Sequence, residues 1–207
     1  MSSTNTALLV IDVINSCADE RYEIPKVDIG FSRIREVVPK LEKFLKQYRK
    51  VVNGMVIFVK TTPWRKEFLT ANINELYTDP KAAYYSEDTS GFAEEFYKVT
   101  PQKGDTIFTK NHYDAFVNPK LDKTLKGRGI KYLVVAGIFG DGCVLATVCG
   151  GFSKGYNFVI LKDLIETTDS KTRQELQKYL KEFTWPIMYG RTLTSSEFLK
   201  AWKKFNP

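Results

Sequence analysis

Six short apolar runs, spread along the chain, constrain its fold more than any other feature. They occupy residues 7–13, 55–61, 106–110, 132–137, 157–161 and 186–189. The first reads ALLVIDV and the fourth YLVVAG, so apolar residues occupy both faces of a strand formed by either run. This pattern is typical of strands that are covered on both sides in a parallel sheet. The chain is therefore expected to bury its sheet between two layers of helices.

Segments of helical period separate these runs. Apolar residues recur there at steps of three and four residues, which places them on one face of a helix. They are Ile34, Val37, Val38, Leu41, Phe44 and Leu45; Leu176, Tyr179, Leu180 and Phe183; and Phe198, Leu199 and Trp202. Shorter helices are expected at 121–126 and from Cys143 to about Lys154, each followed by a glycine.

The alternation of strands and helices predicts one α/β domain over residues 1–207. Its expected form is a Rossmann-like three-layer α/β/α sandwich around a six-stranded, mostly parallel sheet. Residues 63–103 are the least regular part of the sequence. We expect them to supply short helices and a loop near the carboxyl edge of the sheet.

Composition narrows the class of protein. Hydrophobic residues make up 43% and charged residues 27%, as in globular chains, and three cysteines are too few for a disulfide scaffold. The N-terminus has no basic segment, and its apolar run is too short for a signal peptide, so a cytoplasmic protein is expected. Residues 132–152 are long enough to cross a membrane, but Gly137, Gly140 and Gly142 interrupt them. A buried strand, a turn and a buried helix are predicted there instead.

The net charge of +7 raises the question of an anionic partner. The basic residues are mixed with glutamates along helical segments such as 40–50 and 171–181. This distribution is typical of solvated helix faces, and no nucleic-acid-binding motif accompanies it. Neither a nucleic acid nor a membrane is therefore predicted as a partner.

Three reactive side chains stand at or just after predicted strand ends: Asp12, Lys110 and Cys143. The carboxyl ends of parallel strands share one edge of the sheet, where ligands bind. Cys143 follows the glycine-rich GIFGDG and opens a helix, whose N-terminus favours the thiolate and whose N–H groups can stabilise an oxyanion. A lysine beside Asp12 would keep the carboxylate ionised, and Asp12 could then take the thiol proton.

Each of these residues also has a structural interpretation. Cys143 can be a small residue packed against the sheet, as is expected for Cys149. Asp12 can cap a helix or lie in a loop, and Lys110 at a buried strand end simply needs a partner. Local sequence leaves both interpretations open.

Four motifs in order carry a family resemblance: ALLVIDVIN, FTKNHYDAF, VVAGIFGDGCV and ILKDLIET. From Ala7 to about Leu199 the chain resembles the isochorismatase-like cysteine hydrolase family, which includes nicotinamidases and N-carbamoylsarcosine amidases. The resemblance implies a six-stranded parallel sheet and an Asp–Lys–Cys triad, which falls on Asp12, Lys110 and Cys143. It also implies a cis peptide bond between Ile138 and Phe139, and an oxyanion hole made by the Phe139 and Cys143 amides. Asp141 matches an acidic residue of the family's loop, where a structural role is expected.

Two departures from the family pattern concern the pocket. Ile14, Asn15 and Cys17 stand where the family often has Gln or Asn and then Phe. Cys17 therefore lines the pocket, or merely replaces an aromatic wall; an oxidised pairing with Cys143 is a third reading. Nicotinamidases carry an Asp and two or three His after the second strand, whereas His112 is the one histidine here. No metal and no cofactor are predicted.

Aromatic residues supply the other pocket candidates. Trp64 can stack on a flat substrate or simply pack, Tyr113 and Phe139 are candidate walls, and Phe116 is expected in the core. Other aromatic residues would suit the interface of a homo-oligomer, which the resemblance implies: Tyr84, Tyr85 and Tyr97.

The function these residues favour is hydrolysis of a C–N bond in a small amide or carbamoyl substrate, through a thioester acyl-enzyme on Cys143. One alternative is vinyl-ether hydrolysis of an isochorismate-like diacid, which relies on the aspartate as proton donor and commonly lacks the cysteine. A second is a non-catalytic binding relative. A third is nucleotide binding, in which Gly137, Gly140, Gly142 and Asp163 would imitate a dinucleotide fingerprint with altered spacing.

Overall fold

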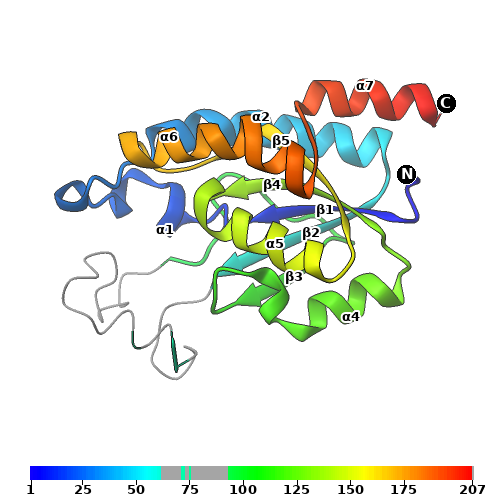
Figure 1. Ribbon diagram of the computed structural model, residues 1–207, viewed down its shortest axis with the longest axis horizontal. Helices are drawn as coiled ribbons and strands as arrows, with labels where there is room; N and C mark the ends of the chain where they lie inside the picture. Colours follow the sequence, from blue (N-terminus) through cyan, green and yellow to red (C-terminus); the bar gives the residue numbers. More distant parts are fainter. Residues whose placement is uncertain (62–70, 73–74, 76–92, 207) are drawn as a thin grey trace.

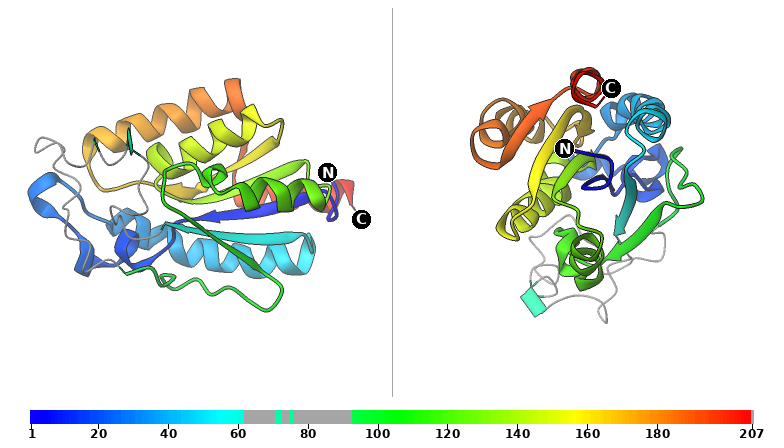
Figure 2. Two further views of the ribbon diagram at one scale, coloured as in Figure 1. Left: turned by 90° about the horizontal axis from the view of Figure 1, so that it is seen from below. Right: turned by 90° about the vertical axis from the view of Figure 1, so that its right-hand side faces the viewer.

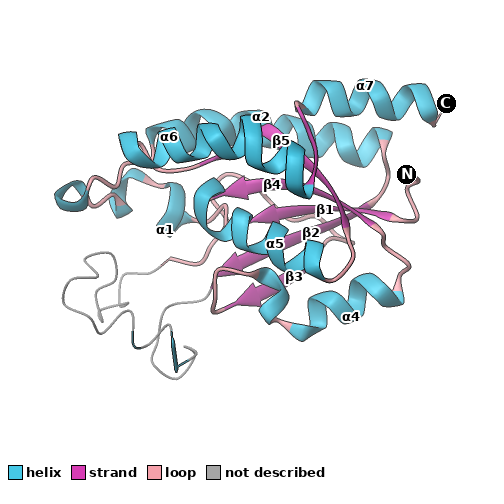
Figure 3. Ribbon diagram, viewed as in Figure 1, coloured by secondary structure: helices cyan, strands magenta, loops and turns pink. Residues whose placement is uncertain are grey.

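The computed structural model describes residues 1–61, 71–72, 75 and 93–206. Six strands in this part of the chain form one sheet in the order β3-β2-β1-β4-β5-β6, and each neighbouring pair is parallel (Figures 1 and 3). They are β1 (Thr6–Ile11), β2 (Met55–Thr61), β3 (Thr106–Lys110), β4 (Tyr132–Ile138), β5 (Asn157–Glu166) and β6 (Gly190–Leu193). The predicted α/β fold with a six-stranded parallel sheet is confirmed.

Helices bury both faces of this sheet (Figure 2). Along β1, Leu8 and Val10 belong to the core on one face, and Ala7, Leu9 and Ile11 to the core on the other. Helices α2 and α7 pack on the first face, and α4, α5 and η6 on the second. The helices are α1 (Asn15–Ala18), α2 (Ser32–Val51), α4 (Pro119–Gly127), α5 (Leu145–Ser153), α6 (Lys171–Tyr179) and α7 (Ser195–Phe205), the 3-10 helices η1 (Glu20–Tyr22), η2 (Pro25–Val27) and η4 (Ala115–Val117), and the π-helical segments η5 (Gly140–Val144) and η6 (Leu180–Tyr189).

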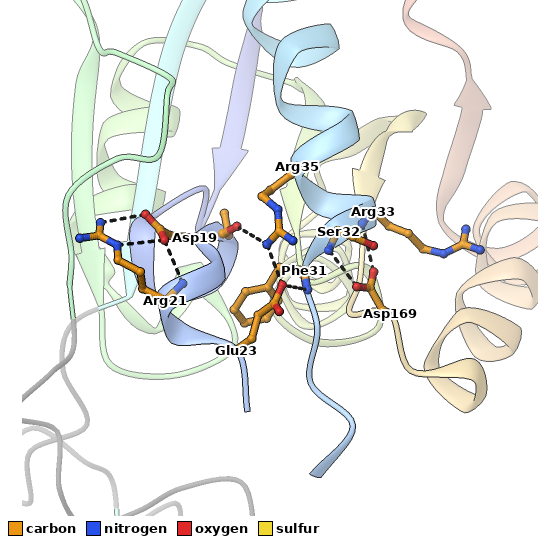
Figure 4. A network of polar contacts seen from close by, with 9 residues as sticks. Asp19, Arg21, Glu23, Phe31, Ser32, Arg33, Arg35 and Asp169 are labelled. Carbon is orange, nitrogen blue, oxygen red and sulfur yellow. Dashed lines mark hydrogen bonds and ion pairs between the residues drawn. The ribbon is translucent and has the colours of Figure 1, made fainter. Parts of the chain in front are cut away.

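Helix α2 illustrates how the apolar period becomes packing. Every apolar position predicted from its period is buried. Its N-cap residue, Phe31, supplies no side-chain hydrogen bond. Asp169, which lies beyond the end of β5, supplies the cap instead, because its carboxylate accepts the N–H groups of Ser32 at 2.8 Å and Arg33 at 3.0 Å (Figure 4). The start of α2 is thus tied to the carboxyl edge of the sheet.

The predicted strand at 186–189 is wrong. The chain instead continues helically from α6 through η6, and β6 begins at Gly190. This winding buries Leu180 and Trp185, whereas Ile187 and Met188 remain exposed. A short apolar run therefore did not identify a strand here, because the core contacts come from residues just before it.

The long apolar run at 132–152 divides as expected into strand β4, the turn η5 and helix α5. Among the residues that the structure describes, no helix combines the length and the hydropathy that a membrane crossing requires.

The described end of the irregular region pairs with the segment after β1. Ile14 and Phe96 form an antiparallel bridge, and the Tyr97 N–H donates to the Val13 carbonyl at 2.9 Å. Tyr97 is buried by this pairing, so its proposed place on an exposed interface is wrong. Tyr84 and Tyr85 lie outside the described residues, and the homo-oligomer stays a prediction.

Candidate active site

The structure brings Asp12, Lys110 and Cys143 together at the carboxyl edge of the sheet. The Lys110 Nζ lies 2.8 Å from the Asp12 Oδ2 and 3.2 Å from the Cys143 sulfur. All three residues are buried, with exposed fractions of 1% for Asp12, 3% for Lys110 and 7% for Cys143. One ammonium group therefore bridges a carboxylate and a thiol.

Strand order explains why a lysine is needed at position 110. Strand β2 separates β3 from β1, and Lys110 is paired in register with Thr61, the last residue of β2. The long lysine side chain spans this gap and also donates to the His112 carbonyl at 2.8 Å, which fixes its direction. Asp12, in turn, has a φ of 51°, and its N–H donates to the Val59 carbonyl at 2.9 Å.

Cys143 sits in the turn η5 rather than at the start of a helix. The helical winding begins at Gly140, three residues earlier than predicted, and α5 follows from Leu145. The Phe139 carbonyl accepts the N–H groups of Gly142 and Val144 at 3.0 and 3.1 Å. The peptide bond between Ile138 and Phe139 is cis, as the resemblance implied.

Gly137 lets β4 reach this turn. Its φ is +127°, and a Cβ atom built there would lie 2.2 Å from the Ile11 carbonyl oxygen. No other residue type fits this conformation and this space. The glycine therefore brings the end of β4 against the end of β1, which carries Asp12.

The electrostatics of Cys143 differ from the sequence prediction. Burial, with the Asp12 carboxylate beside it, raises the pKa of Cys143 to about 12, and Lys110 only partly offsets this. The expectation that the helix N-terminus favours the thiolate is wrong for the resting protein, because desolvation of the sulfur outweighs it. For Lys110, burial lowers the pKa, but Asp12 and Cys143 outweigh burial and raise the pKa above its ordinary value. The resting site therefore holds a neutral thiol beside an ammonium ion.

These shifts predict how stability depends on pH. The folded protein binds the Cys143 proton more tightly than the unfolded chain, because the pKa rises from 9.0 to about 12 on folding. This stabilisation is complete below pH 9 and is lost as the pH rises from 9 toward 12, at up to about 1.4 kcal/mol per pH unit. The raised pKa of Lys110 acts in the same direction at higher pH.

Urea unfolding at pH 8 and pH 10 measures this effect. Between these values wild-type protein should lose about 1 kcal/mol more unfolding free energy than Cys143→Ala. Equal losses in the two proteins would contradict the raised pKa of the thiol.

The pocket candidates have different surroundings. Cys17 is buried in α1, where burial and then Asp12 and Cys143 raise the pKa of its thiol well above the ordinary value, so it lies within electrostatic range of the site. Tyr113 is half-buried and contacts His112 edge-on, with ring centroids 5.8 Å apart. Phe139 is half-buried. Phe116 lies in the core, as predicted, and Trp64 lies outside the described residues.

The absence of a metal stays a prediction. Within the described ranges no three His, Cys, Asp or Glu side chains are grouped as metal ligands. His112 instead accepts the Asp114 N–H at its Nδ1, 3.3 Å away. The segment after β2, where nicotinamidases carry their ligands, is mostly outside these ranges.

Sequence reasoning missed the side chains that hold the nucleophile's turn. Asp141 has the structural role expected of it, but its partners were not foreseen: it accepts two hydrogen bonds from Arg173, at 2.6 and 2.7 Å, and one from Thr167. Thr167 follows β5 and Arg173 lies in α6, more than 25 residues along the chain from Asp141. The sequence offered one signal for these contacts. Asp141 stands in the apolar and glycine-rich segment GDGC, where no neighbouring residue can pair with its carboxylate.

Asp163, the residue of the nucleotide-binding alternative, is also occupied. Its carboxylate accepts the N–H and the hydroxyl of Ser195, both at 2.7 Å, at the start of α7. Because Asp163 caps helix α7, it is not available as the acidic residue that the nucleotide-binding alternative requires.

Comparison with known proteins agrees with this fold. The sequence model of the isochorismatase domain matches residues 6–191, so the chain belongs to the isochorismatase family. It is 26% identical over 200 residues to the ureidoacrylate amidohydrolase RutB of Stutzerimonas stutzeri, covering 89% of this chain and 80% of that protein.

Solved structures share the fold. A cysteine hydrolase from Pseudomonas syringae pv. phaseolicola superposes with a TM-score of 0.80 at 20% identity, over 99% of this chain and 95% of the other. The N-carbamoylsarcosine amidase of Thermoplasma acidophilum superposes with a TM-score of 0.64 at 20% identity, over 94% of this chain and 97% of the other.

Proposed function

We propose that this protein is a cysteine-dependent hydrolase that cleaves the C–N bond of a small amide or carbamoyl substrate. The observation that carries the proposal is the Lys110 ammonium, which lies 2.8 Å from the Asp12 carboxylate and 3.2 Å from the Cys143 sulfur. A carboxylate that lies beside the thiol in this way can accept its proton during attack. We assign this chemistry to a triad of Asp12, Lys110 and Cys143.

In the first half of the reaction, the Cys143 sulfur attacks the carbonyl carbon while its proton moves to Asp12. Because the pKa of the resting thiol is raised to about 12, this proton transfer accompanies the attack instead of preceding it. The Phe139 and Cys143 amides are proposed to bind the resulting oxyanion. The C–N bond then breaks, Asp12 returns the proton to the departing nitrogen, and a thioester remains on Cys143.

In the second half, water attacks the thioester carbon and gives its proton to Asp12. The tetrahedral intermediate expels the sulfur, which recovers the proton from Asp12, and the acid product leaves. Lys110 keeps its charge throughout, because its pKa lies above the ordinary lysine value. Its role is to stabilise the negative charge that passes between the carboxylate and the sulfur.

The names of the relatives support this class of substrate. RutB of S. stutzeri is a ureidoacrylate amidohydrolase, and the T. acidophilum protein is an N-carbamoylsarcosine amidase. Both names describe cleavage at an amide-type carbonyl that carries nitrogen. We therefore infer that ureido and N-carbamoyl compounds are the first substrates to try.

The setting also fits a cytoplasmic enzyme. Cys17, Cys143 and Cys149 are all free thiols in the structure. The proposed nucleophile must stay reduced to act, as thiols do in the cytoplasm.

Mass spectrometry of the intact protein tests the proposal. Wild-type enzyme is mixed with a panel of small amides, ureido compounds and N-carbamoyl amino acids and is quenched in acid within seconds. We expect an acyl adduct that peptide mapping assigns to Cys143, together with release of the amine or ammonia. Amine release by a variant that lacks Cys143 would refute the mechanism. Adducts that form on Cys149 in preference to Cys143 would refute it too.

A further inference from the structure

We infer that Arg173 is a positioning residue that holds the turn η5, and with it Cys143 and the Phe139 amide, in the geometry used for attack. The inference rests on the proposed function, because it concerns how that nucleophile is oriented. It adds a residue from α6, which lies outside the proposed triad.

The first contact of Arg173 is with Asp141, two residues before Cys143. The Arg173 Nε donates to the Asp141 Oδ2 at 2.6 Å, and its terminal nitrogen donates to the Oδ1 at 2.7 Å. The Asp141 side chain is only 6% exposed and also accepts the Thr167 hydroxyl. A two-pronged, largely buried pair of this kind fixes orientation as well as distance.

The second contact of Arg173 is with Phe139, four residues before Cys143. The guanidinium carbon lies 5.0 Å from the centre of the Phe139 ring, within the range of cation–π attraction. The Phe139 ring also stacks on Phe31, with centroids 6.0 Å apart. Arg173 thus contacts both Phe139, which directly precedes the turn, and Asp141 inside it.

The partner on the other side of Phe139 is itself anchored. The Phe31 N–H donates to Glu23 at 2.9 Å, and the next two N–H groups donate to Asp169 (Figure 4). Phe139 therefore packs between a fixed segment at the start of α2 and the guanidinium from α6. This arrangement leaves the turn little freedom to rotate.

Helix α6 supplies a second contact to the turn one helical turn later. A Cβ atom on Gly140 would lie 2.0 Å from the Gln177 Oε1, so the glutamine packs directly on the first residue of η5. Its Nε2 donates to Glu166, the last residue of β5. Because Arg173 and Gln177 project from the same helix face, α6 acts as a rigid brace behind the nucleophile.

The chain offers a matched control for an arginine variant. Arg49 pairs with Asp105 near the C-terminal end of α2, with side-chain exposures of 19% and 8%. These resemble the 21% and 6% of Arg173 and Asp141. Arg49→Lys alters a comparably buried ion pair without touching η5.

The experiment compares wild type, Arg173→Lys, Thr167→Val and Arg49→Lys. The first readout is the rate constant for alkylation of Cys143 by iodoacetamide between pH 7 and 10, followed by peptide mass spectrometry, which separates Cys143 from Cys149. The titratable groups whose charges act on the thiol are Asp12 and Lys110, and Cys17 lies within electrostatic range of it. The second readout is kcat and KM on an amide that acylates the wild-type enzyme.

Loosening the turn should expose the sulfur and misplace the oxyanion donors. For Arg173→Lys we expect alkylation about tenfold faster throughout pH 7 to 10, and kcat about 10- to 100-fold lower with KM changed less than about threefold. Thr167→Val should shift both readouts in the same direction by about threefold, and Arg49→Lys should match wild type in both.

An Arg173→Lys protein whose alkylation rate equals that of Arg49→Lys throughout pH 7 to 10 would overturn the inference. The alkylation readout needs no substrate. Wild-type protein that hydrolyses no amide would therefore refute the proposed function and leave this test of Arg173 intact.

Discussion

Replacement of Cys143 by alanine should abolish amide hydrolysis and lower kcat/KM by about 10³-fold or more. The reason is that the thioester of the proposed route forms on the Cys143 sulfur, which the variant lacks. The variant should still fold, because removal of one small, largely buried sulfur costs only about 1 kcal/mol. The measurement is steady-state turnover on the amide that acylates the wild-type enzyme.

Cys149→Ala is the matched control for this variant. Cys149 lies in α5, six residues after Cys143, and is half-buried beside Tyr189 rather than Asp12 or Lys110. Its removal should leave kcat/KM within about twofold of wild type. A comparable loss in the two variants would mean that the effect is structural.

The same variant separates amide hydrolysis from its main alternative. Vinyl-ether hydrolysis of an isochorismate-like diacid relies on Asp12 as a proton donor, so its rate should survive Cys143→Ala. Retained turnover of such a diacid, together with failure to turn over any amide, would replace the proposed function by the alternative. Loss of all activity in Asp12→Asn is common to the two reactions and does not discriminate between them.

Replacement of Lys110 by methionine should destabilise the fold by about 3–5 kcal/mol, because it leaves the Asp12 charge buried and unpaired. Asp12 is 1% exposed and lies 2.8 Å from the ammonium that would be lost. Chemical denaturation at pH 7 measures the loss. Lys60→Met provides the control, because Lys60 is half-buried and its ion pair with Glu94, at 3.3 Å, should be worth less than about 1 kcal/mol.

A double variant shows whether the unpaired charge is the cause. Asparagine tolerates the positive φ of 51° at position 12 better than most residues, so Asp12→Asn removes the charge without new backbone strain. Lys110→Met combined with Asp12→Asn should therefore recover most of the stability that Lys110→Met loses, while remaining inactive. A double variant as unstable as the sum of the two single variants would show that packing, not charge, explains the loss.

Much of the fold was predictable because the local hydrophobic pattern of the central strands indicates that both their faces are buried. Residues 7–13 and 55–61 are apolar on both faces, and both contain strands of the central sheet. The same rule failed at 186–189, where Trp185 rather than the run itself enters the core. A four-residue apolar run is too short for its period to separate a strand from a helical turn.

The residues of the candidate site were predictable from the sequence, but the protonation of Cys143 was not. Asp12, Lys110 and Cys143 each lie at or after the carboxyl end of a strand. Parallel strands end at one edge of the sheet, so the meeting of these residues could be anticipated. The protonation of the thiol could not, because the pKa of Cys143 depends on burial by residues distant in sequence. The contacts of Arg173 were missed for a related reason, because no local sequence pattern indicates that α6 packs against the turn η5.

The sequence alone determined the class of fold, the edge of the sheet that carries the candidate site, and the three side chains proposed for that site. These could be predicted because hydrophobic periodicity and strand ends are local properties of a chain. Three-dimensional packing settled how far Lys110 must reach across β2, whether Cys143 keeps its proton, and what holds Asp141 and Phe139. Those properties depend on desolvation and on contacts between distant segments, and no local pattern encodes them.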